Sequence, residues 1–230
     1  MRFNFTFFTA LLFSLFGYSQ TVLFQDDFED NKNNWIYSGD AFESKIEKGQ
    51  LILENKHATN SKWRYISITQ NADLIDFDIE TEITLTKTPT DYATYGLVWG
   101  MYSDNSDYRV VQLSANKQSQ IYQYYGKEFH YNKKWGASKN VEGKGRKNKI
   151  RVEKRANIFK VYLNGNLEYQ TGDNAYYGSS FGFIVDSGVT IEIENLKITE
   201  IPFSINIALL SSKFLPRSMI TILLFSNFIS

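Results

Sequence analysis

Three carboxylates at every second position are the residues of this chain best suited to acid–base chemistry. They are Asp76, Asp78 and Glu80, and a β-strand would hold all three on one face. Two carboxylates set across a cleft can act as acid and nucleophile in glycoside hydrolysis. The same spacing also arises from a strand with one solvated face, and we favour that interpretation because simple alternation explains it.

A second candidate for chemistry is a polar cluster in a predicted turn. Asp104, Asn105 and Asp107 offer the hard oxygen ligands that calcium prefers. Such residues are also ordinary hairpin-loop composition, and we favour that interpretation. The two histidines, His57 and His130, are far apart, and the chain has no cysteine. No thiolate site or disulfide can therefore form, and no cofactor other than calcium is expected.

Residues 92–125 indicate three consecutive strands joined by two tight polar loops. With loops at 103–107 and 115–117, Trp99 lies opposite Val111, and Ile121 joins Val111 from the third strand. Tyr102 then lies opposite Tyr108. The predicted core face comprises Leu97, Trp99, Val111, Leu113 and Ile121. The predicted outer face comprises Gly96, Gly100, Tyr102, Tyr108, Gln112, Gln120, Tyr122 and Tyr124.

The outer face of this unit is the strongest indication of function. A tyrosine offers a flat apolar ring and a hydroxyl, and a sugar needs both. Trp135, in a basic segment over residues 127–146 that we expect to be a loop, is placed to fold over this face. The predicted binding residues are Tyr102, Tyr108, Gln112, Tyr122, Tyr124 and Trp135. Ordinary cross-strand pairing of these tyrosines is the alternative interpretation.

The elements around this unit predict an all-β protein. Residues 76–86 alternate strictly, which puts Phe77 on a core face and Asp78 on the other. Lys48-Gly49 and Asn164-Gly165 are hairpin turn signals. About a dozen strands at regular spacing, with no amphipathic helix, predict an antiparallel two-sheet β-sandwich.

The two ends of the chain differ from the middle. Residues 1–19 resemble a signal peptide, with Arg2 before an apolar stretch and with Gly17 and Ser19 at a cleavage site. The protein is thus expected to be exported, to the periplasm, the cell surface or the medium. Residues 20–200 form the predicted domain. The apolar tail, residues 201–230, has no clear transmembrane segment; contact with a membrane and no role in the fold both stay open.

Charge is balanced overall but not locally. The chain has 25 basic and 25 acidic residues. Residues 127–155 are mainly basic, whereas residues 25–82 are mainly acidic. The basic part would suit an anionic polysaccharide, a phospholipid headgroup or a protein partner. The alternative interpretation is that it is solvated and balances the charge of the acidic part. No nucleic-acid-binding motif is present.

An ordered set of motifs resembles the concanavalin A-like jelly-roll superfamily, in its laminin-G-like and Bacteroidetes-type secreted modules. The motifs are DDFEDNKNNW, DFDIETEI, YGLVWGMYSDNSDYRVVQLS, VYLNGNLEY, YYGSSFGFIV and IEIENLKI, within residues 22–199. The resemblance implies two curved sheets with a concave face that often binds glycans. Relatives that act on sugars are family-16-type glucanases and 3-keto-disaccharide hydrolase-like domains, but Asp76 stands where the glucanase signature has a glutamate.

We therefore expect an exported, non-catalytic module that binds a glycan through the concave sheet face. A glycoside hydrolase using Asp76, Asp78 and Glu80 is the alternative. A protein–protein interaction module of a cell-surface assembly is the third possibility.

Overall fold

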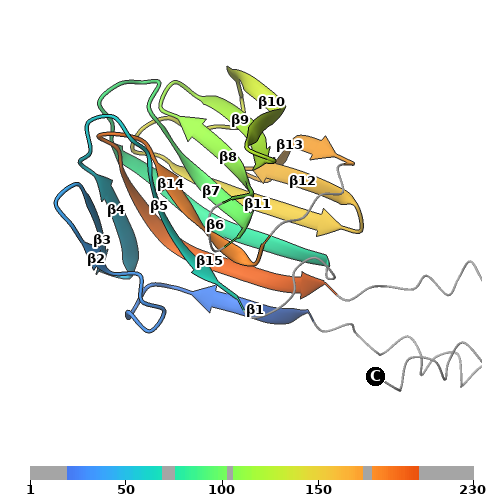
Figure 1. Cartoon of the computed structure of the whole chain (residues 1–230), viewed down its shortest axis with the longest axis horizontal. Coiled ribbons are helices and arrows are strands. Elements are labelled where there is room, and N and C mark those ends of the chain that lie inside the picture. The colour runs from blue at the N-terminus through green and yellow to red at the C-terminus, as the bar shows by residue number, and fades with distance from the viewer. Residues whose placement is uncertain (1–19, 69–75, 103–105, 173–177, 202–230) are drawn as a thin grey trace, which may run out of the picture.

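The protein is a sandwich of two antiparallel β-sheets (Figure 1). The computed structural model describes residues 20–68, 76–102, 106–172 and 178–201, and all regular elements within them are strands. The nine-stranded sheet contains β1 (Thr21–Asp26), β2 (Tyr37–Ser38), β3 (Phe42–Glu47), β4 (Gln50–Asn55), β6 (Asp76–Lys87), β11 (Lys147–Arg155), β12 (Ile158–Leu163), β13 (Asn166–Thr171) and β15 (Thr190–Ile201). The six-stranded sheet contains β5 (Lys62–Ser67), β7 (Thr94–Met101), β8 (Tyr108–Ser114), β9 (Gln118–Tyr125), β10 (Glu128–Ala137) and β14 (Ser180–Val185).

Strand order shows that each sheet is assembled from distant parts of the chain. The larger sheet runs β13-β12-β11-β6-β15-β4-β3-β2, and β1 pairs with β15. The smaller sheet runs β10-β9-β8-β7-β14-β5. The prediction of an all-β, two-sheet antiparallel sandwich of jelly-roll type is confirmed.

The main core lies between the sheets and follows the predicted alternation. On β6 the inward side chains are fully buried, namely Phe77, Ile79, Thr81, Ile83 and Leu85. The smaller sheet contributes the predicted core face, namely Leu97, Trp99, Val111, Leu113 and Ile121, and all five are buried in the same cluster. Period-two patterning therefore identified both inner faces correctly.

Two turns have the backbone geometry that their sequences demand. Lys48 and Gly49 have φ of 54° and 69° between β3 and β4, and Asn164 and Gly165 have φ of 50° and 82° between β12 and β13. Positive φ at both central residues is the type I′ requirement, which Asn-Gly meets with little strain.

The register of the three-strand unit was predicted correctly in one hairpin and wrongly in the other. Ile121 pairs with Val111 as expected. In the first hairpin, however, Val111 pairs with Leu97 and not with Trp99, which is a slip of two residues. Gly100, at φ 64°, lies at an irregularity near the end of β7. A two-residue slip keeps side chains on their faces, so both faces were assigned correctly up to Trp99. Beyond it the prediction is wrong, because the irregularity at Gly100 brings Met101 into the outer cluster.

The basic segment at residues 127–146 is not a loop throughout, which corrects the prediction. Residues Glu128–Ala137 form β10, the edge strand that pairs with β9. Its pairing shifts between Tyr131 and Lys133 and again between Lys133 and Gly136. Each irregularity breaks the alternation, which concealed the strand in the sequence.

Glu168 connects the edges of the two sheets. This β13 side chain is 5% exposed and forms an ion pair with Lys133 Nζ of β10 at 3.2 Å. Ser119, Ser138 and Asn140 also donate hydrogen bonds to its carboxylate. Burial by itself would raise the pKa of Glu168, but these donors together hold that pKa below its usual range.

Replacing this carboxylate tests the connection. Glu168→Gln is expected to lower the free energy of unfolding by about 2 kcal/mol at neutral pH, because several buried donors lose a charged acceptor. The folded pKa is lower than the unfolded value of about 4.3, so the contribution is complete above that pH and is lost as the pH falls through the folded pKa. Urea unfolding of wild type and Glu168→Gln at a series of pH values measures this contribution to the free energy of unfolding.

The control for this variant is Glu142→Gln, since the exposed Glu142 lies 3.7 Å from Lys117. That change should cost less than about 0.5 kcal/mol. A difference between wild type and Glu168→Gln that stays constant down to about pH 3 would contradict the assignment, because the linked protonation would then be missing.

The predicted leader and most of the predicted tail lie outside the described residues, so they stay predictions. Within the described part, no helix has the length and hydropathy needed to span a bilayer.

Candidate functional site: an aromatic sheet face

The outer face of the six-stranded sheet carries a continuous group of aromatic side chains, which we call the aromatic face. It comprises Trp63, Tyr65, Tyr108, Tyr122, Tyr124, Phe129 and Tyr131. They come from β5, β8, β9 and β10 and pack with Val98, Met101, Val110 and Ile184. The smaller sheet therefore has a second apolar cluster on the side that faces away from the main core.

The rings contact one another in a row that crosses the strands. The ring centroids of Trp63 and Tyr108 are 4.8 Å apart, those of Tyr108 and Tyr124 are 5.2 Å apart, and those of Tyr124 and Phe129 are 4.9 Å apart. Trp63 on β5 and Tyr108 on β8 are separated in the sheet by β14 and β7, so their rings meet above these two strands. Tyr131 extends the row, with its centroid 6.0 Å from that of Tyr122.

Exposure divides the aromatic face into a floor and an accessible part. Tyr108 and Tyr122 are only 8% and 6% exposed, so they form the floor. Phe129 and Tyr131 are 53% and 49% exposed. Tyr124 is half-buried between the two groups. A ligand would therefore touch the rings of β10 more than the floor tyrosines of β8 and β9.

The floor tyrosines stay neutral. Burial is the main cause that raises the pKa of Tyr108, to about 12, and burial also raises the pKa of Tyr122 strongly. Both hydroxyls remain protonated at physiological pH and can donate as well as accept hydrogen bonds.

One end of the face is polar and internally hydrogen-bonded. Gln112 Nε2 donates to Thr94 Oγ1 at 3.1 Å, and Thr94 Oγ1 donates to Asp186 Oδ2 at 2.7 Å. Ser61 Oγ donates to the other oxygen of Asp186 at 2.6 Å. Gln112 lies on the predicted face, but its amide is committed at least in part to this chain of hydrogen bonds.

The predicted binding residues therefore fall into two groups. The structure brings Tyr108, Tyr122 and Tyr124 together, with Gln112 on the same face. Tyr102 is 43% exposed just after β7, and Trp135 is 39% exposed in the irregular part of β10. Neither of these two has a described ring contact with the aromatic face.

Sequence reasoning missed Trp63, Tyr65, Phe129 and Tyr131. Trp63 and Tyr65 alternate along β5, but nothing in the sequence shows that β5 closes this sheet beside β14. Phe129 and Tyr131 also alternate, directly before the first bulge of β10. A search for aromatic residues at i and i+2 would have found both pairs.

The candidate catalytic carboxylates lie on the outer face of the other sheet, at Asp76, Asp78 and Glu80. Asp78 forms ion pairs with Arg151 at 3.0 Å and Arg155 at 3.1 Å, and Glu80 pairs with Lys149 at 2.7 Å. A pocket of about 220 Å³ adjoins Glu80, but Lys149 and Lys197 also line it. These carboxylates thus neutralise the basic strand β11.

Of the candidate calcium ligands, Asp104 and Asn105 lie outside the described residues. Asp107 Oδ1 accepts a hydrogen bond from the Gly126 backbone N–H at 3.1 Å. No group of three or more His, Asp or Glu side chains among the described residues is placed to hold a metal ion.

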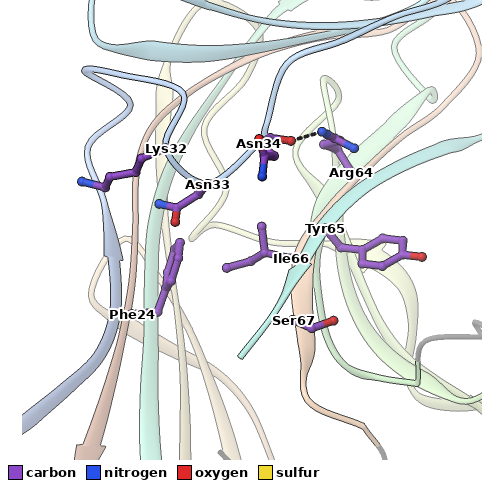
Figure 2. A pocket seen from close by; sticks show the side chains of 8 residues that line it. All are labelled: Phe24, Lys32, Asn33, Asn34, Arg64, Tyr65, Ile66 and Ser67. Atoms are coloured by element: carbon purple, nitrogen blue, oxygen red, sulfur yellow. Dashed lines mark hydrogen bonds between the residues drawn. The ribbon is translucent and has the colours of Figure 1, made fainter. Parts of the chain in front are cut away.

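A pocket of about 500 Å³ opens at the edge of the sandwich, between β1 with its following loop and β5 (Figure 2). Phe24 and Ile66 point into it, whereas Tyr65 points away. Arg64 at its rim donates to the backbone carbonyls of Asn34, Trp35 and Ile36. Because these contacts already occupy the guanidinium, we assign this pocket a structural role at the sheet edge.

The comparisons with known proteins bear on the fold. No known protein family and no curated protein sequence matches the chain. A protein of unknown function with a galectin-like fold from Bacillus subtilis is similar, with TM-score 0.59 and 11% identity over 81% of this chain and all of that chain. The CBM2 module of the evolved Dit of Lactobacillus casei BL23 phage J-1 has TM-score 0.53 and 10% identity, over 80% of this chain and 98% of that one.

An enzyme is similar to the same degree. The Bacillus licheniformis β-glucanase has TM-score 0.53 and 9% identity, over 77% of this chain and 97% of that one. The chain therefore shares the two-sheet antiparallel jelly-roll fold of these solved structures, which include a CBM2 module and a β-glucanase. At these identities the likeness concerns the fold alone, so function must be argued from the site.

Proposed function

We propose that this protein is a non-catalytic module that binds a glycan on its aromatic face and that acts outside the cytoplasm. The observation that carries the proposal is the contiguous row of rings, whose exposed end is Phe129 and Tyr131. Flat rings stack on the C–H faces of sugars, and the nearby Tyr hydroxyls can hydrogen-bond to sugar hydroxyls. The similar CBM2 module supports the proposal at the level of the fold.

The arrangement of carboxylates supports a role without catalysis. Most glycoside hydrolases use a pair of carboxyl groups that flank the scissile bond of the bound sugar. The outward strand positions of this face carry no carboxylate among the described residues. Asp186 lies just after β14, at the polar end of the face, and Thr94 and Ser61 hold both of its oxygens. Asp78 and Glu80 lie on the opposite side of the sandwich and face cations.

Export is supported by the sequence alone. Residues 1–19 have the charge, length and small residues of a signal peptide. Detection of the mature protein, beginning near Gln20, in the periplasm or medium would test this part of the proposal.

A glycan array tests the binding proposal. Wild type should bind a defined set of glycans, and Tyr131→Ala should lose most of that signal. The matched control is Tyr37→Ala on β2, because Tyr37 is also 49% exposed but belongs to the other sheet. If wild type binds no glycan, or if Tyr131→Ala and Tyr37→Ala bind equally well, the proposal is wrong and a protein partner becomes the better explanation.

A further inference from the structure

The charges on and around the aromatic face narrow the kind of glycan that would fit it. At its regularly paired outward positions, the described residues include neither lysine nor arginine. These positions are Trp63, Tyr65, Ser67, Thr94, Gly96, Val98, Tyr108, Val110, Gln112, Ser114, Gln120, Tyr122, Tyr124, Phe129, Tyr131, Ser180, Gly182 and Ile184. An anionic polysaccharide is normally held by basic side chains, frequently by Arg in a bidentate geometry.

The charges at the border of the face are few and of both signs. Asp186 lies at the polar end, beside Thr94. At the β9–β10 turn, Lys127 is followed by Glu128, and Asp107 accepts from Gly126. Lys134 is a cation at this border, since residues 134 and 135 lie across from Gln120 in the bulge of β10. The border therefore does not make the face strongly positive.

Within the basic segment that the sequence suggested for an anionic ligand, the basic residues of β11 are engaged elsewhere. Lys147 lies 2.9 Å from Glu82 and 2.6 Å from Glu194. Arg151 pairs with Asp78 at 3.0 Å and with Glu153 at 2.8 Å. These pairs cover the outer face of the nine-stranded sheet, so the positive charge of β11 is neutralised by β6, β15 and its own Glu153.

The direction of the ring row suggests how a glycan would lie. Tyr108, Tyr124 and Phe129 come from three successive strands of the sheet, and each ring contacts the next. The row thus crosses the strands, and a single sugar would cover only part of it. An extended chain lying across β8, β9 and β10 would contact several rings at once.

We infer that the aromatic face selects uncharged glycan chains over anionic ones and that the chain lies across the strands. This inference rests on the proposed function. Stacking on neutral rings gains little from charge on the ligand, while burial of a sulfate or carboxylate without a cationic partner costs free energy.

The test compares uncharged glycans with sulfated, sialylated and uronic-acid-containing ones on the same array, followed by affinity electrophoresis of the glycans that bind. Uncharged chains should bind, more tightly as they lengthen from two sugars to several. Their Kd should change by less than about twofold between low salt and 1 M NaCl, where screening acts beyond about 3 Å. Lys134→Ala should leave their Kd unchanged, whereas Tyr131→Ala should weaken binding.

Three outcomes separate the inference from the proposed function. Binding only to anionic glycans, lost in 1 M NaCl and in Lys134→Ala, would overturn the inference and leave glycan binding intact. Equal binding of neutral and anionic forms would also overturn the claimed selectivity. Binding of no glycan would overturn the proposed function and the inference together.

Discussion

Replacing both exposed rings of the aromatic face, in the variant Phe129→Ala/Tyr131→Ala, is expected to weaken glycan binding by roughly thirtyfold. This corresponds to about 2 kcal/mol, which is the size of effect typical of central aromatic contacts. The two rings are the most exposed members of the aromatic face, so they offer a ligand the largest apolar area. Isothermal titration calorimetry with the oligosaccharide that binds best on the array measures the change.

Replacing these two rings distinguishes a loss of binding from a loss of stability better than replacing the tyrosines beneath them. Tyr122 is 6% exposed and contacts the rings of Tyr108, Phe129 and Tyr131. Its removal would leave a cavity and cost about 3–5 kcal/mol of folding free energy, so lost binding would be ambiguous. The double variant should keep a wild-type melting curve within a few degrees. An unchanged Kd in a folded double variant would show that the ligand binds elsewhere.

Asp26→Ala is expected to lower the free energy of unfolding by about 3–4 kcal/mol. Asp26 is 1% exposed at the end of β1. Its carboxylate accepts hydrogen bonds from the Phe28 backbone N–H at 2.8 Å, from Asn33 Nδ2 at 2.6 Å and from Trp35 Nε1 at 2.8 Å. Alanine would leave these donors without an acceptor. Each buried donor that lacks an acceptor costs about 1–3 kcal/mol.

The same hydrogen bonds hold two aromatic residues of the core, Phe28 and Trp35, in position. The Phe28 and Trp35 rings meet edge to face, with centroids 5.7 Å apart, and both are fully buried. Urea unfolding of Asp26→Ala beside Asp27→Ala, an exposed neighbour, measures the effect. Asp27→Ala should cost less than about 0.5 kcal/mol. If the two variants are equally stable, then the loop is held by ring packing and not by the carboxylate.

The sequence was sufficient to predict the two layers of the fold. It was not sufficient to predict the order of the strands within each sheet. Alternation assigned Phe77 and Val111 to the core and Tyr122 to the other face, because a strand allows only two orientations. Alternation says nothing about which strands are neighbours. The meeting of Trp63 with Tyr108 depends on the order β5-β14-β7-β8, which the chain reaches through distant segments.

The candidate site was likewise only half predictable. Tyr108, Tyr122 and Tyr124 were found because the short β8–β9 hairpin fixes their mutual positions. How deeply they are buried could not be read from the sequence, since Phe129 and Tyr131 pack beside them from a strand whose bulges hid its pattern. The ion pairs of Asp78 with Arg151 and Arg155 were also hidden, because β6 and β11 are about 70 residues apart in the chain and pair only in the sheet.

The most direct test of glycan binding by the aromatic face is amide chemical-shift mapping by NMR during titration of the ¹⁵N-labelled protein with the best-binding oligosaccharide. The account predicts shift changes centred on Tyr124, Phe129 and Tyr131, and extending across β8, β9 and β10. Changes centred instead on Asp78 and Glu80 of β6, or on the edge pocket beside Arg64, would contradict it.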